Sequence, residues 1–178
     1  MSINKNQINE YFANHWKGHI NDNHNYTNVK SILKNIGRKD QVLDVGCGYN
    51  PFKKALGKRL YAFDPALPYG DEMVDVESFN ANGRQWDVVL CLGSINFGNT
   101  SVIRPQVEKV ASLVKPGGKI IWRQNPGLQD HGNKECEEIK FFPWSYQLNH
   151  KLAHENGFKV TDMKWDNNRR IFSIWVKE

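Results

Sequence analysis

Strand-like and helix-like segments alternate along this chain from Gln41 to its C-terminal residues, and this alternation restricts the possible folds most. Short apolar, β-branched runs are separated by segments that carry apolar residues at helical spacing. Such alternation predicts a mostly parallel sheet with helices on both faces. The last two strand-like runs are joined by the turn Asp166-Asn-Asn, so they must pair antiparallel. We therefore expect a three-layer α/β sandwich that ends in an antiparallel hairpin.

This pattern predicts seven strands. They cover residues 41–45, 59–63, 71–76, 86–92, 119–123, 158–165 and 170–176, and the third is the least apolar. Helices are expected over residues 51–57, 102–114 and 143–156. The sequence Lys115-Pro-Gly-Gly is expected to end the second of these helices, and Gly157 to end the third.

The first forty residues are polar and rich in Asn. Apolar residues recur at three- and four-residue steps over 5–17, which predicts an amphipathic helix, and residues 18–25 are expected to form a loop. A second helix is expected over 27–35, with Thr27 as its N-cap. We expect a single domain over 1–178, with a helical cap at 1–38 and an α/β core at 39–178.

A glycine turn follows the first expected strand directly, in the run VLDVGCGYNP at residues 42–51. Gly46 and Gly48 lack a β-carbon, so the backbone there can bend tightly and approach a ligand closely. Asn50 and Pro51 together favour a helix start, as an N-cap followed by the first helical residue. Open α/β sheets bind ligands at the carboxyl ends of their strands, where this turn lies.

Asp64 ends the second expected strand, twenty residues after Asp44. A carboxylate at that position can accept hydrogen bonds from both hydroxyls of a ribose. A dinucleotide would need a third glycine where this chain has Pro51, and the acidic Asp44 suits a cationic ligand better than a pyrophosphate. NAD is therefore disfavoured, and a P-loop is excluded because Gly-Lys-Ser/Thr does not occur.

From Gln41 onward the sequence resembles the Rossmann-like, seven-stranded S-adenosylmethionine-dependent methyltransferases of class I. Five segments carry the resemblance, in the family's order: VLDVGCG (42–48), YAFD (61–64), Asp75-Val76, WDVVLCLG (86–93) and LVKPGGK (113–119). The resemblance implies S-adenosylmethionine as the cofactor, with Asp64 at its ribose and Asp75-Val76 at its adenine.

The cofactor residues expected on this basis are Asp44, Gly46, Cys47, Gly48, Asn50, Asp64, Pro65, Asp75, Val76, Leu92 and Gly93. The chain departs from the family pattern in two places. Asn50 stands where a third glycine is commoner, and about five residues separate Ala66 from Asp71, too few for the usual helix. The second departure leaves the adenine side more open.

The resemblance also places the methyl acceptor. It implies an acceptor site between the end of the fourth strand (93–97), the segment after the fifth (124–127) and the N-terminal segment. Candidate substrate-binding residues are Asn96, Phe97, His24 and Tyr26; Trp16 and Trp144 are further aromatic candidates, although each aromatic is more commonly a core residue. Methyltransferases of adenine or cytosine amino groups carry Asn/Asp-Pro-Pro-aromatic after the fourth strand. This chain has Gly-Ser-Ile-Asn-Phe there, so that class is disfavoured.

The sequence identifies no catalytic residue. Methyl transfer from a sulfonium depends mainly on position, and a base is needed only when the acceptor must lose a proton. If a histidine is that base, His19, His24 and His131 are the candidates, because loops over the site would carry them. The histidines and the three cysteines follow no metal-binding spacing, so no metal site is expected.

The formal net charge of +5 is compatible with an anionic partner but is also common on solvated surfaces. A small-molecule acceptor is the leading prediction; a nucleic-acid (RNA) methyltransferase and a non-catalytic S-adenosylmethionine-binding module remain alternatives. No apolar run reaches the roughly 18 residues of a membrane helix, and no secretory signal is recognisable, so we expect a cytoplasmic protein without a membrane partner. The oligomeric state is left open.

Overall fold

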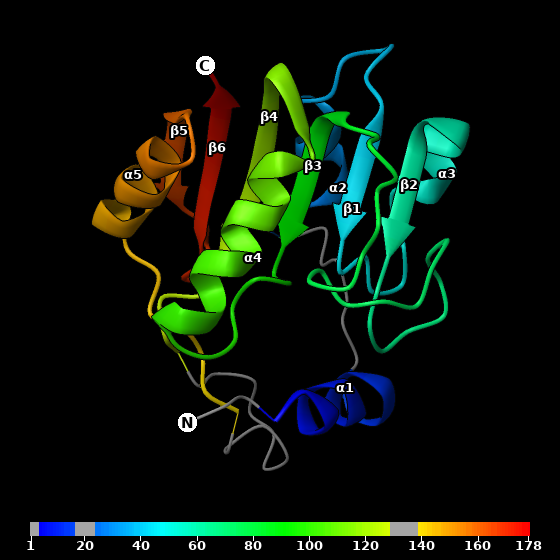
Figure 1. Cartoon of the computed structure of the whole chain (residues 1–178), viewed down its shortest axis with the longest axis vertical. Helices are drawn as coiled ribbons and strands as arrows, with labels where there is room; N and C mark the ends of the chain where they lie inside the picture. The colour runs from blue at the N-terminus through cyan, green and yellow to red at the C-terminus, as the bar shows by residue number, and fades with distance from the viewer. Residues whose placement is uncertain (1–3, 17–23, 129–138) are drawn as a thin grey trace.

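The computed structural model describes residues 4–16, 24–128 and 139–178, and its centre is a six-stranded sheet (Figure 1). The strands are β1 (Val42–Val45), β2 (Leu60–Phe63), β3 (Trp86–Leu92), β4 (Val114–Gln124), β5 (Phe158–Trp165) and β6 (Ile171–Lys177). Their order across the sheet is β2-β1-β3-β4-β6-β5. The first four are parallel, and β6 runs antiparallel to both β4 and β5. The mixed α/β class and the terminal hairpin are confirmed.

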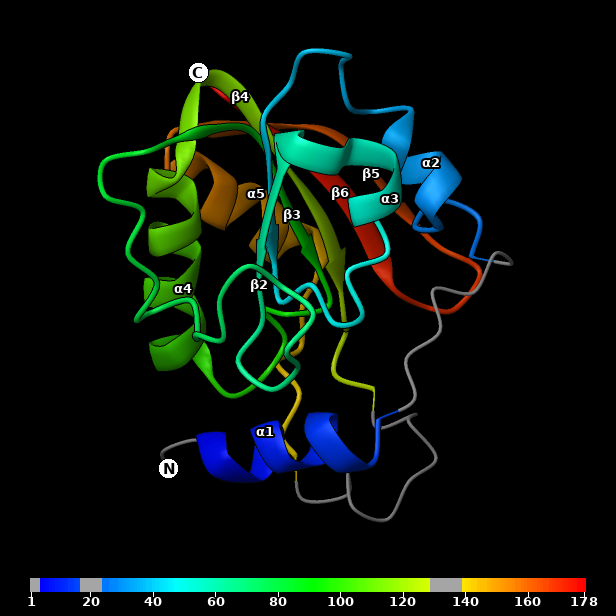
Figure 2. The same cartoon turned by 90° about the vertical axis from the view of Figure 1, so that its right-hand side faces the viewer.

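The helices form two layers and one cap. They are α1 (Lys5–Asn14), α2 (Val29–Leu33), α3 (Lys53–Leu56) with the 3₁₀ turn η1 (Gly57–Arg59), α4 (Thr100–Ser112) and α5 (Tyr146–Glu155). Figure 2 shows α4 and α5 on one face of the sheet and α2 and α3 on the other. The helix α1 lies apart from both layers, across the end of the sheet where β1, β2 and β3 finish.

Two hydrophobic cores hold the layers together, one on each face of the sheet. The larger core joins inward residues of β3 and β4 to the apolar stripe of α4 and to α5, with Val107, Trp122 and Trp175 fully buried. The smaller core joins Ile32 of α2 and Leu56 of α3 to the opposite face. Because consecutive residues of a strand point to opposite faces, β1 contributes to both cores and is buried throughout.

The prediction of a seventh strand at 71–76 is wrong. Only one bridge, between Phe63 and Glu72, connects this segment to β2. The Asp71 carboxylate accepts the backbone N–H of Ala62 at 2.9 Å, so a side chain occupies the edge position that a neighbouring strand would use. The short connection after β2 also holds no crossover helix, which a parallel neighbour requires. The sheet therefore ends at β2, and its edge is covered by the Asp71 carboxylate and by backbone hydrogen bonds with residues 71 and 72.

Three helix starts differ from their predicted positions, and side-chain caps fix two of them. The cap of α2 is Asn28, not Thr27, and its side chain accepts the N–H of Ser31 at 2.8 Å. Ser145 caps α5 two residues after the expected start at Pro143. Asn50 does not cap α3: its φ is +52°, in the left-handed region, and Phe52 is the N-cap residue.

The strand β4 starts earlier than predicted and includes the sequence Lys115-Pro-Gly-Gly. The pairing of β3 with β4 shifts in register at this sequence, since Trp86 pairs with Val114 but Val88 pairs with Lys119. A β-carbon at Gly118 would lie 2.8 Å from the carbonyl oxygen of Asp87, so only glycine fits this close approach. Within the described ranges, no helix is both long and apolar enough to cross a membrane.

Candidate functional site

The turn after β1 is held between two side chains. Gly46 and Gly48 have φ values of +70° and +55°, in the left-handed region that favours glycine. A β-carbon at Gly46 would overlap the β-carbon of Ser94, which follows β3. One at Gly48 would lie 3.1 Å from the ring of Trp16. Conformation thus favours glycine at both positions, space excludes a β-carbon at Gly46, and both residues line the cavities described below.

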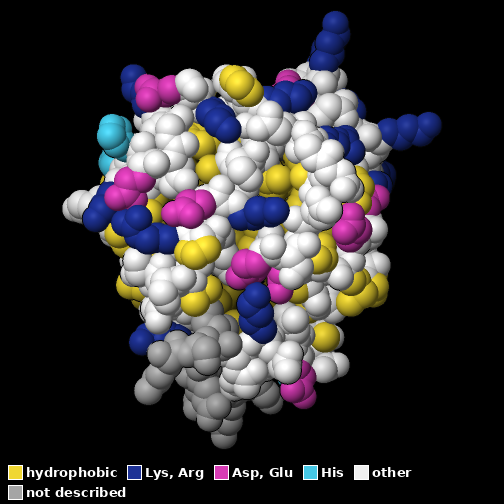
Figure 3. All heavy atoms as spheres, in the orientation of Figure 1, with side chains coloured by type: hydrophobic (Ala, Val, Ile, Leu, Met, Phe, Trp, Pro, Cys, Tyr) yellow, Lys and Arg dark blue, Asp and Glu magenta, His cyan; other side chains and the backbone are white. Residues whose placement is uncertain are grey.

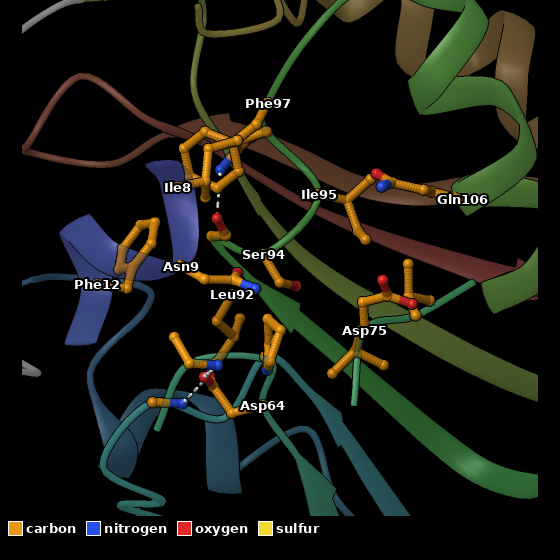
Figure 4. Close-up of a pocket in the computed structure, with 18 of the residues that line it drawn as sticks. Ile8, Asn9, Phe12, Asp64, Asp75, Leu92, Ser94, Ile95, Phe97 and Gln106 are labelled. Atoms are coloured by element: carbon orange, nitrogen blue, oxygen red, sulfur yellow. Dashed lines mark hydrogen bonds between the residues drawn. The ribbon is translucent and has the colours of Figure 1, made fainter. Parts of the chain in front are cut away.

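Asp64, directly after β2, fixes two loops at once. Its carboxylate accepts the N–H of Gly48 at 2.9 Å (Figure 4), and those of Ala66 and Leu67 at 2.8 and 2.9 Å. Each carboxylate oxygen can accept more than one hydrogen bond, so acceptor capacity is left for a ligand. The side chain lines the cavity although it is only 7% exposed.

Asp44 is a second carboxylate at this end of the sheet, and it is almost fully buried. Burial, and then the nearby charge of Asp64, raise the pKa of Asp44 to about 7. A positive charge placed beside Asp44 would favour its ionised form. The pair of carboxylates therefore fits a cationic ligand better than an anionic one.

Asp75 and Val76 line the same cavity on the side of the predicted adenine. Asp75 accepts the N–H of Ser78 at 2.8 Å and the ammonium group of Lys5, from α1, at 3.0 Å. Burial alone raises the pKa of Asp75, but these hydrogen bonds outweigh burial and hold it below its ordinary value. Asp75 is thus ionised at neutral pH and joins α1 to this part of the site.

Two cavities meet at the glycine turn. The first, of about 230 Å³, runs from Lys5 and Asp75 past Asp64 to the ends of β3 and β4. The second, of about 650 Å³, extends from the turn towards His24 and Thr27. Both are lined by Trp16, Gly46, Gly48, Leu92 and Arg123. In Figure 4 the side chains of α1, Ile8 and Phe12 among them, lie across the cavity from Gln106 of α4.

Aromatic rings and amides line the first cavity beyond the end of β3. Phe97 contacts Phe12 and Phe141, with ring centroids 5.5 and 5.2 Å apart. The buried Asn96 donates to the carbonyl oxygen of Gly93 at 3.0 Å and accepts the N–H of Asn125 at 2.9 Å. Asn96 thereby ties the end of β3 to the end of β4. This wall combines apolar contact with fixed polar groups, which is typical of small-molecule sites.

Arg123, at the end of β4, is held by Asp166 across the sheet at 2.9 Å. Asp166 is fully buried and also accepts the backbone N–H groups of Asn168 and Arg170. His24 lies near these charges, and burial, followed by the positive charge of Arg123, lowers its pKa below the ordinary value. His24 is therefore neutral at pH 7 and able to accept a proton.

Most of the predicted site residues line the two cavities. These are Asp44, Gly46, Cys47, Gly48, Asp64, Pro65, Asp75, Val76, Leu92, Gly93, Asn96, Phe97, His24 and Trp16. Asn50 lines neither cavity and donates its side-chain N–H to the carbonyl oxygen of Tyr69. Tyr26 packs on Phe172 instead, and Trp144 is a core residue whose indole donates to the carbonyl oxygen of Ile95. His19 and His131 lie outside the described residues.

Several lining residues were not singled out from the sequence. They are Lys5, Ile8, Asn9 and Phe12 of α1, Ser94, Gln106 of α4, Arg123, Phe141 and Arg170. The amphipathic pattern over 5–17 indicated a buried face on α1 but not which surface it would cover. Phe141 and Arg170 carry no local signal, because tertiary packing alone brings them to the cavity.

The described cysteines are not reactive groups. Burial raises the pKa of the Cys47 thiol, and burial also raises that of Cys91 well above the ordinary value, so both thiols stay protonated. In the described part of the chain, no group of three or more His, Cys, Asp or Glu is placed to hold a metal ion.

Comparisons with known proteins agree with this geometry at the level of the fold. No family model matches the sequence, and no curated protein matches it either. Among solved structures, one similar chain is the 1,6-didemethyltoxoflavin-N1-methyltransferase of Burkholderia thailandensis, solved with 1,6-didemethyltoxoflavin and S-adenosylhomocysteine. The TM-score is 0.64 at 15% identity, over 81% of this chain and 73% of that one.

A putative S-adenosylmethionine-dependent methyltransferase of Listeria monocytogenes gives a TM-score of 0.64 at 13% identity, over 84% of this chain and 97% of that one. Magnesium protoporphyrin IX methyltransferase of Synechocystis, solved with S-adenosylhomocysteine, gives 0.58 at 18% identity, over 78% and 74%. Identities this low concern the fold alone. The chain has the fold of the class I S-adenosylmethionine-dependent methyltransferases.

Proposed function

We propose that this protein binds S-adenosylmethionine and transfers its methyl group to a small-molecule acceptor. One observation carries the proposal: four separate sequence motifs line a single cavity. They are the Gly46–Gly48 turn, Asp64, Asp75-Val76 and Leu92-Gly93. Similar chains solved with S-adenosylhomocysteine or S-adenosylmethionine bound support the same cofactor.

The residues of the cavity fit the parts of this cofactor. Asp64 would accept hydrogen bonds from the ribose hydroxyls, and Asp75 with the N–H of Val76 would bind the adenine. The glycine turn has no β-carbon where the chain of the cofactor would pass. Asp44 would be ionised by the positive charges of the methionine part, because its pKa of about 7 responds to any nearby cation.

The cofactor supplies a methyl group on a positively charged sulfur, which becomes an uncharged thioether when the methyl leaves. The chain then has to orient the acceptor, exclude water and, for some acceptors, remove a proton. Phe12 and Phe97 present apolar surface where an acceptor would lie, while α1 covers this end of the sheet. His24 is the described residue best suited to accept a proton, since its pKa is lowered and it lines the second cavity.

The size of the site supports a small acceptor. The two adjoining cavities, of about 230 and 650 Å³, would have to hold the cofactor and the acceptor together, which favours an acceptor of limited size. Two of the similar structures are methyltransferases of small molecules by name, one of 1,6-didemethyltoxoflavin and one of magnesium protoporphyrin IX. A macromolecular acceptor would have to present one residue or one nucleotide at a time.

Isothermal titration with S-adenosylmethionine and S-adenosylhomocysteine tests cofactor binding. We expect saturable binding of both, weakened at least tenfold by Asp64→Asn, because the amide replaces one acceptor oxygen and removes the charge. Asp162→Asn is the matched control, since Asp162 lies on β5, far along the sheet from β2, and lines neither cavity. Absence of binding by the wild-type protein would refute the proposal.

Transfer itself is tested with cofactor labelled in the methyl group. Label appearing in the low-molecular-weight fraction of a cell extract supports the small-molecule acceptor. Label appearing in RNA or DNA instead would support the nucleic-acid alternative. Cofactor binding without transfer of label to any fraction would support the alternative of a non-catalytic S-adenosylmethionine-binding module.

A further inference from the structure

Positive charge is concentrated in one part of the chain. Residues 27–63 contain eight Lys and Arg and two Asp, a formal charge of +6, so the rest of the chain carries −1. These residues build α2, β1, α3, η1 and β2, and their two helices share one face of the sheet. The excess charge of the whole protein therefore falls within this segment.

Six cations of this region are exposed and take part in no ion pair with the described residues: Lys30, Lys34, Arg38, Lys39, Lys54 and Lys58. Lys53, by contrast, pairs with Asp71 at 3.2 Å. Of the two acids, Asp44 is buried, and Asp40 accepts the N–H of Gly37. Figure 3 shows Lys and Arg side chains projecting at the upper right, around α3 and the loop before β1.

Hydrogen bonds join this region into one surface. The Arg59 guanidinium of η1 donates to the carbonyl oxygens of Gly37 and Asp40, at 2.9 and 3.0 Å, and so holds the α2–β1 loop beside α3. At the other end of α3, Asn50 donates to the carbonyl oxygen of Tyr69 at 2.8 Å. The basic surface, defined by the six exposed cations, is therefore centred near the starts of β1 and β2, and α3 connects it to the glycine turn at their other end.

Three aromatic side chains lie beside the cavities, at the ends of β1 and β2. Trp16 stacks on Tyr49 with an interplanar angle of 9° and centroids 5.5 Å apart, and Tyr69 follows at 5.3 Å from Tyr49. Tyr49 and Tyr69 are 44% and 53% exposed, and Trp16 lines both cavities. The two strands between the rings and most of the cations are four residues long, about 13 Å. A single strand of several nucleotides can therefore reach both, and exposed aromatic rings together with cations are the combination that binds unpaired bases and their phosphates.

We propose that the basic surface and the stack of Trp16, Tyr49 and Tyr69 together bind single-stranded nucleic acid. The cations would contact phosphates, and the tyrosines would stack against bases near the cavity opening. A folded duplex fits less well, because its bases are already stacked and unavailable to the tyrosines. The proposal concerns binding and does not rest on methyl transfer.

Fluorescence anisotropy with a labelled 15-nucleotide single-stranded RNA tests the proposal on the full-length protein. If at least four of the six cations contact phosphates, affinity falls about 50-fold between 50 and 200 mM salt, since each contact contributes about 0.7 to the logarithmic slope. The triple variant Lys34→Gln, Lys54→Gln, Lys58→Gln is expected to reduce this slope by about 2. Tyr69→Ala is expected to weaken binding at least fivefold at constant salt.

The matched control is Lys109→Gln, Lys151→Gln, Lys159→Gln, which removes the same charge from α4, α5 and β5. It should leave the affinity within twofold and the slope unchanged. Equal loss in both triple variants, no effect of Tyr69→Ala, or equal affinity for a duplex of the same length would overturn the proposal, as would absence of RNA binding. Titration of S-adenosylhomocysteine into the same samples separates this outcome from failure of the proposed cofactor site.

Discussion

The proposed cofactor end and the proposed acceptor end of the first cavity are built differently. At the cofactor end, the groups that shape the site are largely backbone: left-handed glycines and three N–H groups gathered by Asp64. At the acceptor end, they are side chains from distant segments, such as Phe12, Phe97 and Phe141. The first arrangement depends on conformation, which few substitutions preserve. The second depends on shape, which many side chains can supply.

This difference separates what each end controls. A site made of backbone and carboxylates recognises one ligand, because its geometry cannot change without refolding the turn. A wall of rings can be altered one residue at a time, so it is suited to determine which acceptor enters. We therefore expect substitutions at the cofactor end to affect stability and cofactor binding together. Substitutions at the acceptor end should affect mainly the acceptor.

The largest expected effect concerns Asp44 and tests whether ionisation of this buried carboxylate destabilises the folded protein. The pKa of Asp44 is raised to about 7 in the folded protein, against about 3.9 in an unfolded chain. The unfolded state therefore loses its proton first, and stability falls as pH rises from about 4 through 7, by as much as about 4 kcal/mol. About 2.6 kcal/mol of this loss falls between pH 5 and pH 8, and thermal unfolding at these two pH values measures it.

Asp44→Asn should reduce the difference in stability between pH 5 and pH 8, whatever its effect on stability at either pH. S-adenosylmethionine, as a cation, should bind more tightly at pH 8 than at pH 6 to the wild-type protein and lose this pH dependence in Asp44→Asn. An equal pH dependence in both proteins would mean that Asp44 is already compensated within the fold.

Gly46→Ala tests the backbone character of the cofactor end. Alanine would have to adopt the left-handed conformation of Gly46, and its methyl group would overlap the β-carbon of Ser94. We therefore expect a loss of about 3 kcal/mol in the free energy of unfolding. Gly83→Ala is the control, because Gly83 has a similar φ of +77° with no atom within 4 Å of the added carbon. It should cost about 1 kcal/mol. Equal losses in urea unfolding would show that conformation, not contact with Ser94, restricts the turn.

The same difference explains how much could be predicted from the sequence. Parallel strands finish at the same edge, so the sequence alone was enough to place the glycine turn after β1 next to Asp64 after β2. The helix α3 was misplaced at its start because Asn50 adopts a left-handed conformation instead of capping. The sequence shows the glycines of the turn, but it does not show the contact of Asn50 with the carbonyl oxygen of Tyr69 in the folded chain.

The missing strand and the acceptor wall show where local pattern fails. Whether 71–76 pairs with β2 is decided by the Asp71 side chain on the N–H of Ala62, which no propensity encodes. Phe141 and Arg170 reach the cavity from segments far along the chain, and nothing in their surroundings marks them. The resemblance pointed to residues 93–97, 124–127 and the N-terminal segment, and members of all three line the cavity. Gln106, Phe141 and Arg170 could not be located from the sequence.

Asn96→Ala tests the polar link at the acceptor end. Its removal leaves the buried N–H of Asn125 without the acceptor seen at 2.9 Å, which costs about 1–3 kcal/mol. Asn168→Ala, on the exposed turn before β6, is expected to change stability by less than about 0.5 kcal/mol. If Asn96→Ala weakens S-adenosylhomocysteine binding as strongly as Asp64→Asn does, the two ends are not separable and the comparison fails.

The smallest expected effect concerns Lys5. This residue of α1 forms ion pairs with Asp75 and Glu77. Lys5 is half exposed, so screening by water and salt leaves such a pair worth about 0.5 kcal/mol or less. Lys5→Ala should therefore lower the unfolding midpoint by no more than about 2 °C. Phe12→Ala, which removes a ring packed on Trp16 and Phe97, should loosen α1 far more. Limited proteolysis within residues 5–14 measures this directly, and faster cleavage in Lys5→Ala than in Phe12→Ala would show that charge, not ring packing, holds α1 over the site.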